Sequence, residues 1–247
     1  MWLANRFASV RRLLAHRDDL QIRLDASADT LPLPPGHLRL RVGIRERSGF
    51  LRLGAVIAQD LFWLLDTSGY AIGRFRAILD FGCGCGRVAR WMPQGLNFTG
   101  CDTDEEAIQW CGTFLAKTGR FRRIMPAPPT PFADGAFDFV YAISVFTHFT
   151  ADHESQWLRE LARVTQPGGV LLASSMDASF SSDPAATTFA GFTCDTQGML
   201  EGYPPSCCNS YHTREYIEQN WTEHFEIVRF EPRGINHHQD AVLMRRR

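Results

Sequence analysis

The sequence predicts an α/β protein with a doubly wound, mostly parallel sheet. First, short apolar runs alternate with stretches of helical periodicity from about residue 76 onward, an order that builds strand–helix–strand units. Second, the glycine-rich stretch GCGCGR at residues 82–87 directly follows the first apolar run, where sheets of this kind bind ligands. Third, 247 residues with 45% hydrophobic and 21% charged side chains are enough for one globular core.

The chain before this alternating region is predicted to hold two helices and a connector. Residues 1–17 carry basic residues and an apolar stripe, which favours an amphipathic helix packed on the domain over a membrane-surface or targeting segment. Asp29–Gly43 contains three prolines and is expected to be extended. Helical spacing of apolar residues predicts a long helix over Phe50–Tyr70. We expect an N-terminal helix and connector at 1–47 and one domain at 48–247.

The alternating region divides into elements at its turn residues. Strands are expected at 75–81, 97–102, 120–125, 136–144 and 170–175, and helices at 86–94, 104–117 and 153–165. From Met176 to Ser210 the chain is rich in Ser, Asp, Pro, Gly and Thr, which predicts no regular element. A regular pattern then returns, with a helix expected at 212–224 and strands at 225–232 and 240–246.

The glycine run is expected to form a backbone cradle for a nucleotide-like ligand, because glycine allows positive φ angles and close approach of a ligand. A dinucleotide fold usually has G-x-G-x-x-G, but Arg87 follows Gly86 here and the third dinucleotide glycine is missing. The Gly-Lys-Ser/Thr ending of a phosphate-binding loop is also absent. The other candidate is S-adenosylmethionine, which has no phosphate and presents an ammonium, a carboxylate, a sulfonium, a ribose diol and adenine.

Two carboxylates accompany the glycine run. Asp80, at the end of the first strand, is placed to complement the ammonium of S-adenosylmethionine directly or through water. Asp102 ends the second strand, about 20 residues further on, where a carboxylate accepts hydrogen bonds from a ribose diol. Dinucleotide folds use the same device, so Asp102 does not separate the two cofactors. The glycine spacing and Asp80 favour S-adenosylmethionine.

Four motifs in succession resemble those of class I S-adenosylmethionine-dependent methyltransferases: ILDFGCGCGR, FTGCDTD, PFADGAFDFVYAISVFTHF and LRELARVTQPGGVLL. The resemblance covers about Phe50 to Arg247. The tail INHHQDAVLMRR is similar to the final strand of that family, so the resemblance implies a Rossmann-like seven-stranded sheet with an antiparallel last strand. SVFTHF and HQD are also similar to bacterial methyltransferases found with sugar and polysaccharide enzymes.

The resemblance implies S-adenosylmethionine as cofactor and a set of binding residues. They are Asp80, Phe81, Gly82, Cys83, Gly84, Gly86, Asp102, Thr103, Ala127, Ser144, Val145 and Phe146. Many relatives have an Asp-Ala pair that reads the adenine amino group where this chain has Pro126 and Ala127. Because proline has neither a carboxylate nor an N–H, adenine recognition is expected to rely on the Ala127 backbone or on another group.

The cysteines offer metal or redox sites as alternatives. Cys83 and Cys85 could ligate a metal, but Cys101 and Cys111 supply no C-x₂-C spacing. Cysteine is also a small, often buried apolar residue, so packing is favoured and no metal is expected. A looser cluster consists of Cys194, Cys207, Cys208 and His212. For that cluster, unrelated thiols are favoured over a zinc site or a disulfide.

His148 follows the fourth strand and is the candidate catalytic residue, because its imidazole could take a proton from an acceptor hydroxyl. The alternative is a histidine that caps the next helix or packs on the rim. Further candidates are Tyr211, His212, His237 and His238. A basic run, Arg39, Arg41, Arg45 and Arg47, could clamp a phosphate or carboxylate of the acceptor, although a solvated face is favoured.

We therefore expect methyl transfer by direct displacement to an oxygen or nitrogen of a small-molecule or glycan-type acceptor. The alternatives are a non-catalytic S-adenosylmethionine-binding module, a dinucleotide-dependent oxidoreductase, and a class I fold that uses the cofactor for other chemistry. The sequence names neither the acceptor nor the oligomeric state.

Composition restricts partners and location. The net charge of −1 argues against a nucleic-acid partner held by phosphate attraction. No apolar run is expected to span a membrane. Seven cysteines without an export signal predict a cytoplasmic protein with reduced thiols. Lys117 is the only lysine, which we interpret as the bias of a GC-rich bacterial genome.

Overall fold

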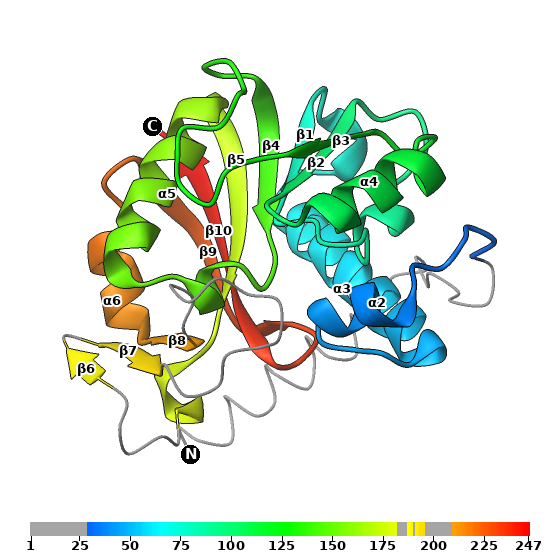
Figure 1. Cartoon of the computed structure of the whole chain (residues 1–247). Helices are drawn as coiled ribbons and strands as arrows, with labels where there is room; N and C mark the ends of the chain where they lie inside the picture. The colour runs from blue at the N-terminus through cyan, green and yellow to red at the C-terminus, as the bar shows by residue number, and fades with distance from the viewer. Residues whose placement is uncertain (1–28, 182–186, 190, 196–208) are drawn as a thin grey trace, which may run out of the picture.

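A computed structural model describes residues 29–181, 187–189, 191–195 and 209–247. Its main feature is a seven-stranded sheet in the order β3-β2-β1-β4-β5-β10-β9. The strands are β1 (Ile78–Phe81), β2 (Phe98–Asp102), β3 (Arg120–Arg123), β4 (Phe137–Ala142), β5 (Thr165–Ser175), β9 (Phe225–Ile235) and β10 (Gln239–Arg246). Only β10 runs antiparallel to its neighbours β5 and β9. The predicted doubly wound sheet with an antiparallel last strand is confirmed (Figure 1).

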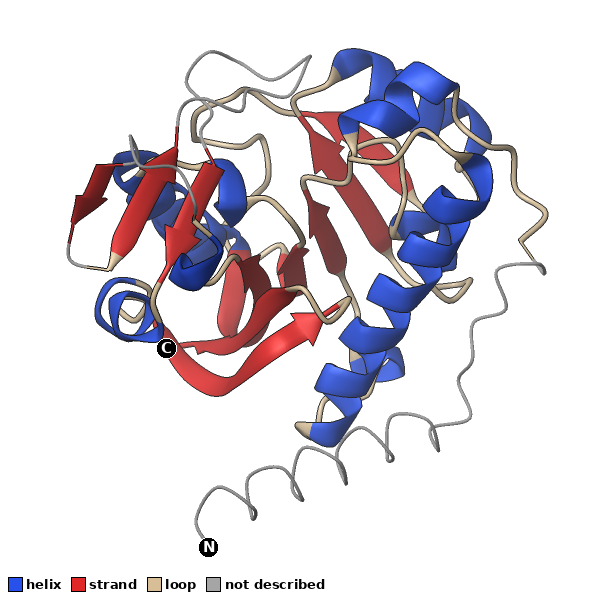
Figure 2. Ribbon diagram, turned by 90° about the horizontal axis from the view of Figure 1, so that it is seen from below, coloured by secondary structure: helices blue, strands red, loops and turns tan. Residues whose placement is uncertain are grey.

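Helices cover both faces of this sheet. One apolar cluster joins the sheet to α5 (Ala151–Val164) and α6 (Arg214–Asn220). A second joins it to α3 (Arg47–Thr67), the long helix along the sheet in Figure 2. The third cluster packs α4 (Glu105–Phe114) against α2 (Gly36–Arg41). The order of the sheet reverses between β1 and β4, which opens a crevice at the carboxyl ends of these strands.

The helix starts follow from capping residues. The Glu46 carboxylate accepts hydrogen bonds from the Ser48 and Gly49 amides and begins α3. Asp104 accepts from the Ala107 amide and begins α4, whose first turn holds Glu105 and Glu106. Carboxylates there stabilise the positive end of the helix dipole. The polar turn after β2 is therefore held in one conformation.

Four sequence predictions differ from the structure. The connector contains the helix α2, because its prolines all precede Gly36 and leave the next residues free to coil. The helix expected at 86–94 is only the 3-10 turn η3 (Ala89–Trp91), since Gly86 has a φ of 79° and Pro93 supplies no N–H. The helix expected at 1–17 lies outside the described residues.

The third difference is a second sheet within Met176–Ser210, where no regular element was expected. It comprises β6 (Thr187–Phe189), β7 (Phe192–Asp195) and β8 (Asn209–His212), preceded by the 3-10 turn η5 (Ala178–Phe180). Two further 3-10 turns are η2 (Ile72–Arg74) and η4 (Phe146–His148). Figure 2 shows this small sheet apart from the large one.

The α3 helix also departs from the expectation that no run is apolar enough to span a membrane. By length and composition alone, α3 is long and apolar enough to span a membrane, with an 18-residue window of mean hydropathy 1.3. However, 67% of that window is buried inside the protein. Its residues Ile57, Leu61 and Leu64 belong to the core beneath the sheet, so α3 packs as a core helix.

Candidate functional site

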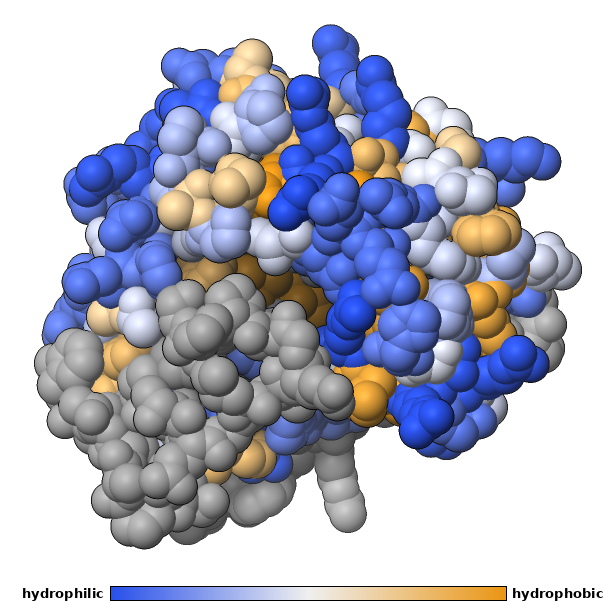
Figure 3. All heavy atoms as spheres, in the orientation of Figure 1, coloured by the Kyte–Doolittle hydropathy of each residue, from blue (hydrophilic) through white to orange (hydrophobic). Residues whose placement is uncertain are grey.

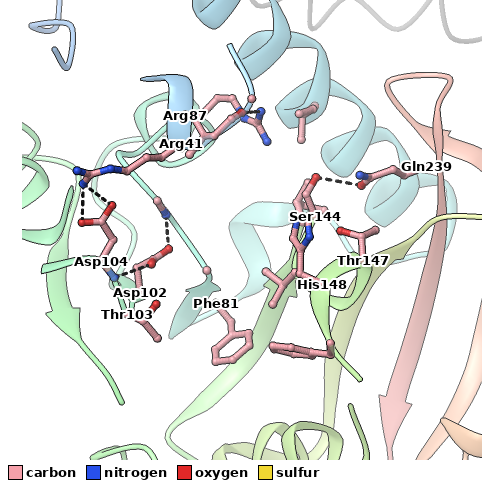
Figure 4. A pocket seen from close by; sticks show the side chains of 18 of the residues that line it. Arg41, Phe81, Arg87, Asp102, Thr103, Asp104, Ser144, Thr147, His148 and Gln239 are labelled. Carbon is pink, nitrogen blue, oxygen red and sulfur yellow. Dashed lines mark hydrogen bonds and ion pairs between the residues drawn. The ribbon is translucent and has the colours of Figure 1, made fainter. Parts of the chain in front are cut away.

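A cavity of about 520 Å³ lies at the carboxyl ends of β1, β2 and β4, at the point where the sheet order reverses. Its volume is typical of sites for small ligands. Figure 3 shows a hollow with an apolar floor near the middle of the molecule. Figure 4 shows two groups of side chains on either side of Phe81. We call them the glycine-loop half, with Asp102–Asp104, Arg41 and Arg87, and the hairpin half, with Ser144, Val145, Thr147, His148, Phe149 and Gln239. Trp157, which stacks on Phe149, also belongs to the hairpin half.

The glycine-loop half is built from main chain. Gly82 has a φ of 81° and Gly84 a φ of 51°, a region that favours glycine. A Cβ on Gly82 would overlap the Val145 side chain, and one on Gly84 would overlap Val42. Both positions therefore require glycine for conformation and for space, and the loop presents bare backbone to the cavity.

Asp102 fastens this loop to the end of β2. Its Oδ2 accepts a 2.7 Å hydrogen bond from the Gly84 amide, and its Oδ1 accepts one of 2.9 Å from the Asp104 amide. Burial raises the pKa of Asp102, although these backbone hydrogen bonds oppose the shift. Each carboxylate oxygen has a second lone pair. Asp102 can therefore accept further hydrogen bonds from a ligand hydroxyl while it holds the loop.

The α2 helix closes over this half of the cavity. Arg41 donates to both oxygens of Asp104, at 3.1 and 2.9 Å, and also pairs with Glu106 at 2.9 Å. Arg87 donates to the Val42 carbonyl at 2.5 Å. The contact between Arg41 and Asp104 joins α2 to the start of α4, and the contact between Arg87 and Val42 joins the end of α2 to the glycine loop. Sequence analysis placed Arg41 in a basic run, but the structure uses it within an ion-pair network.

Asp80 lies beneath the loop and does not line the cavity. Burial raises its pKa to about 7. Its Oδ2 has no hydrogen-bond partner of good geometry, nor has the buried Tyr141 hydroxyl, although that hydroxyl lies near enough to oppose the rise in pKa. A buried carboxyl with an unsatisfied oxygen is costly, and a cation close to the loop would relieve that cost.

The loop cysteines are buried thiols. Burial raises the pKa of Cys85 to about 12 and raises that of Cys83 well above its ordinary value. Both thiols are therefore protonated at neutral pH in the protein without a bound metal. Among the described residues, no group of three or more His, Cys, Asp or Glu side chains is placed to hold a metal ion. Cys207 and Cys208 lie outside those residues, and His212 instead pairs with the buried Glu154 at 2.6 Å.

In the hairpin half, hydrogen bonds fix the chain after β4. Ser144 has a positive φ of 59°, an uncommon conformation for a residue other than glycine. Its amide donates to Ser174 Oγ at 2.7 Å, and its hydroxyl donates to Gln239 Oε1 at 3.1 Å. Ser174 also donates to Gln239 Oε1, at 2.7 Å. Strain in a backbone that its surroundings over-determine is typical of functional sites.

The turn between β9 and β10 brings Gln239 and His238 to the cavity. Asn236 and His237 have φ values of 51° and 53°, and the His238 amide donates to the Ile235 carbonyl at 3.0 Å. This is the two-residue geometry that suits a twisted hairpin. The buried Asp60 of α3 accepts a 2.6 Å hydrogen bond from the Asn236 amide, so α3 holds the turn in place.

The cavity brings together many of the residues that the sequence analysis singled out. Those that line it are Phe81, Gly82, Gly84, Asp102, Thr103, Ser144, Val145, His148, Tyr211 and His238. Asp80, Cys83, Gly86, Ala127, Phe146, His212 and His237 do not. Pro126 lines the cavity in place of its neighbour Ala127, and Phe146 packs in the core against Trp221.

Sequence reasoning missed several lining residues, chiefly Thr147, Trp157, Asn236 and Gln239. Thr147 and Gln239 stand within the SVFTHF and HQD stretches, so the resemblance already contained them. Trp157 belongs to the apolar face of α5 and carried no separate signal. Asp60, which does not line the cavity, is a buried carboxylate among the apolar residues in the middle of α3. That pattern offers a signal for Asp60.

Comparison with known proteins adds three findings. Residues 79–173 match a family described as "Methyltransferase domain". Methyltransferase GfsG of Streptomyces halstedii is 29% identical over 156 residues, 60% of this chain and 54% of its own. Sterol 24-C-methyltransferase erg6 of Schizosaccharomyces pombe is 32% identical over 99 residues, 38% of this chain and 26% of its own. The chain thus spans about half or less of the length of these relatives.

Solved structures share the fold. An S-adenosylmethionine-dependent methyltransferase from Mesorhizobium loti superposes with a TM-score of 0.58 at 14% identity, over 76% of this chain and 98% of its own. The 1,6-didemethyltoxoflavin-N1-methyltransferase of Burkholderia thailandensis, solved with S-adenosylhomocysteine, gives a TM-score of 0.55 at 17% identity. That match covers 87% of this chain and 92% of the other.

Proposed function

We propose that this chain is a class I S-adenosylmethionine-dependent methyltransferase and that it methylates an oxygen or nitrogen of a small organic molecule or saccharide. The observation that carries the proposal is the single cavity that joins the glycine-loop half to the hairpin half. Direct transfer needs both reactants side by side in one enclosure. Positioning of this kind supplies much of the rate of a displacement reaction.

The glycine-loop half fits S-adenosylmethionine. The free lone pairs of Asp102 can accept hydrogen bonds from the ribose diol. The unsatisfied oxygen of Asp80 can complement the ammonium group across the glycine loop or through a bridging water. The apolar side chains of Phe81 and Ile124 offer a surface for adenine. When bound, this cofactor supplies an electrophilic methyl group on a sulfonium.

The chain's own residues then orient the acceptor and remove its proton. His148 lines the hairpin half, where its imidazole would accept the proton of an acceptor hydroxyl. An amine that is already deprotonated would not need this step. Aromatic side chains, Phe149 and Trp157, enclose the same side and exclude water from the reacting atoms.

Several features support a small acceptor in a bacterial cytoplasm. The net charge of −1 offers little attraction to nucleic-acid phosphates. The four described loop and core cysteines are free thiols, as in a reducing compartment. Lys117 is the only lysine among 26 basic residues, which fits a GC-rich bacterial genome.

Calorimetry and a transfer assay together test the proposal. We expect micromolar binding of S-adenosylhomocysteine, no binding of NAD, and transfer of labelled methyl groups from S-adenosylmethionine to small molecules. Tight NAD binding would mean a dinucleotide enzyme. Binding of S-adenosylhomocysteine with no methylated product from any acceptor class would mean a non-catalytic binding module.

A further inference from the structure

The two halves of the cavity differ in charge. Every Arg, Lys, Asp or Glu that lines the described cavity belongs to the glycine-loop half: Arg41, Arg87, Asp102 and Asp104. The titratable groups of the hairpin half are three imidazoles and the Tyr211 phenol. Residues 164–213 of the sequence contain neither lysine nor arginine. Phosphate and carboxylate groups are usually recognised by arginine or lysine, so the hairpin half lacks the usual partner of an anion.

Two buried polar groups in this half make no hydrogen bond with the described protein. They are the Thr147 hydroxyl and the Trp157 indole N–H. Thr147 is 6% exposed and Trp157 is 2% exposed, and both residues line the cavity. An unsatisfied buried donor is costly. The indole N–H can only donate, so its complement is an oxygen or nitrogen lone pair.

A third donor is oriented by the serine pair. Ser174 Oγ accepts from the Ser144 amide, so its own proton goes to Gln239 Oε1. Ser144 donates to the same oxygen. Because both hydroxyls donate to Oε1, the side-chain amide of Gln239 is oriented with its nitrogen, Nε2, facing away from the two serines. That nitrogen donates to none of the described residues, while Gln239 lines the cavity.

We propose that the hairpin half binds an uncharged molecule through its hydroxyl or carbonyl oxygens, which accept from Gln239, Thr147 and Trp157. This inference rests on the proposed function and narrows the methyl acceptor to an uncharged class. Thr147 and Gln239 lie on the same side of the cavity as His148 (Figure 4), and Trp157 lines the same cavity and stacks on Phe149. They therefore also set which acceptor atom faces the imidazole.

The first test identifies the charge of the acceptor. A small-molecule extract is divided into a pool that neither anion- nor cation-exchange resin retains, an anionic pool and a cationic pool. Each is incubated with the protein and methyl-labelled S-adenosylmethionine. We expect label in products of the unretained pool. Transfer only from a charged pool, or from none while S-adenosylhomocysteine binds, would overturn the inference. Failure to bind S-adenosylhomocysteine would instead overturn the proposed function.

The second test uses variants with the active pool. Thr147→Val removes the hydroxyl and Thr147→Ser keeps it. We expect Thr147→Val to raise KM for the pool about tenfold, with kcat and S-adenosylhomocysteine affinity nearly unchanged and Tm equal or higher. The Thr147 hydroxyl has no hydrogen-bond partner among the described residues, so its removal costs no stability and Tm is expected not to fall. Thr147→Ser should retain a KM close to the native value. An unchanged KM in Thr147→Val, or an equal loss in both variants, would contradict the donor role.

Gln239→Glu removes the N–H donors at nearly constant shape and adds a negative charge. Its matched control is Gln166→Glu, the same change at an exposed residue of β5. We expect KM for the unretained pool to rise at least about tenfold in the first variant and to stay constant in the second. If KM for the unretained pool is native in Gln239→Glu, Gln239 does not donate a hydrogen bond to the acceptor.

Discussion

The Asp102 carboxylate accepts a 2.7 Å hydrogen bond from the amide of Gly84, so the residue expected to bind ribose also holds the glycine loop. The two tasks share one side chain because Asp102 ends β2 beside the loop that leaves β1. Substitution at this position therefore tests the architecture and the ligand together.

We expect Asp102→Ala to weaken S-adenosylhomocysteine binding at least about tenfold and to lower the free energy of unfolding by about 1–3 kcal/mol. The affinity falls because both the ligand's acceptor and the loop's anchor are lost. Calorimetry and urea unfolding measure the two effects. Asp66→Ala, at an exposed position of α3, is the control. Indifference of S-adenosylhomocysteine to Asp102→Ala would contradict the placement of the ribose.

Asp80 makes stability depend on pH. The folded protein holds its proton up to about pH 7, whereas the unfolded chain releases it near pH 4. The folded state therefore binds more protons between these values, and stability falls as pH rises through this window. Asp80→Asn should remove this pH-dependent destabilisation. At pH 8 the free energy of unfolding of the variant should therefore be about 2–4 kcal/mol higher than that of the native protein.

Urea unfolding of both proteins at pH 4.5, 6 and 8 measures this difference. Asp240, another buried carboxyl with a raised pKa, affects both proteins alike, whereas the charge of Asp102 contributes to the raised pKa of Asp80 itself. The two curves should meet near pH 4 and diverge toward pH 8. Parallel curves would mean that Asp80 is charged in the folded protein throughout.

His148→Gln tests the catalytic base. For a hydroxyl acceptor, we expect kcat to fall about 100-fold or more, with the affinity for S-adenosylhomocysteine unchanged. The acid limb of the kcat profile should also disappear, because the group that must be deprotonated is gone. His224→Gln, outside the cavity, serves as control. Native kcat in His148→Gln would show that the acceptor atom needs no base from this residue.

Asp60 is expected to position the β9–β10 turn without contacting the acceptor. Asp60→Ala removes the acceptor of the Asn236 amide and should lower the unfolding free energy by about 1–3 kcal/mol while raising the acceptor KM. Asp60→Asn keeps one carbonyl oxygen and should recover most of both losses. Asp66→Ala, at an exposed position of the same helix, should change neither. If the acceptor KM is native in Asp60→Ala, the turn is held by other contacts.

Most of the sheet could be predicted because its central strands are apolar runs bounded by turn residues, whereas the edge strand β3 (RFRR) is exposed and mostly charged. β1 and β4 are buried along most of their length, as strands inside a parallel sheet must be. The small sheet could not be predicted. Its strand β8 alternates half-buried and buried residues with polar identities, as in Ser210 and His212, and its pairing depends on partners elsewhere in the chain.

The same distinction applies to the cavity. Gly82, Gly84 and Asp102 belong to local motifs, and local motifs are visible in a sequence. Gln239 meets Ser144 across 95 residues, and Asp60 meets Asn236 across 176. No short-range pattern encodes such contacts, because they arise only when the sheet brings β10, β4 and α3 together.

The small sheet enters the chain between β5 and α6, and the seven-stranded order continues undisturbed on either side of it. The part of the gene that encodes residues 176–212 is therefore a natural unit of exchange. Recombination at its two ends would keep the glycine-loop half and change the residues that line the acceptor side of the cavity. Such an exchange would have to keep Phe192, which belongs to the main core, and His212, which pairs with the buried Glu154.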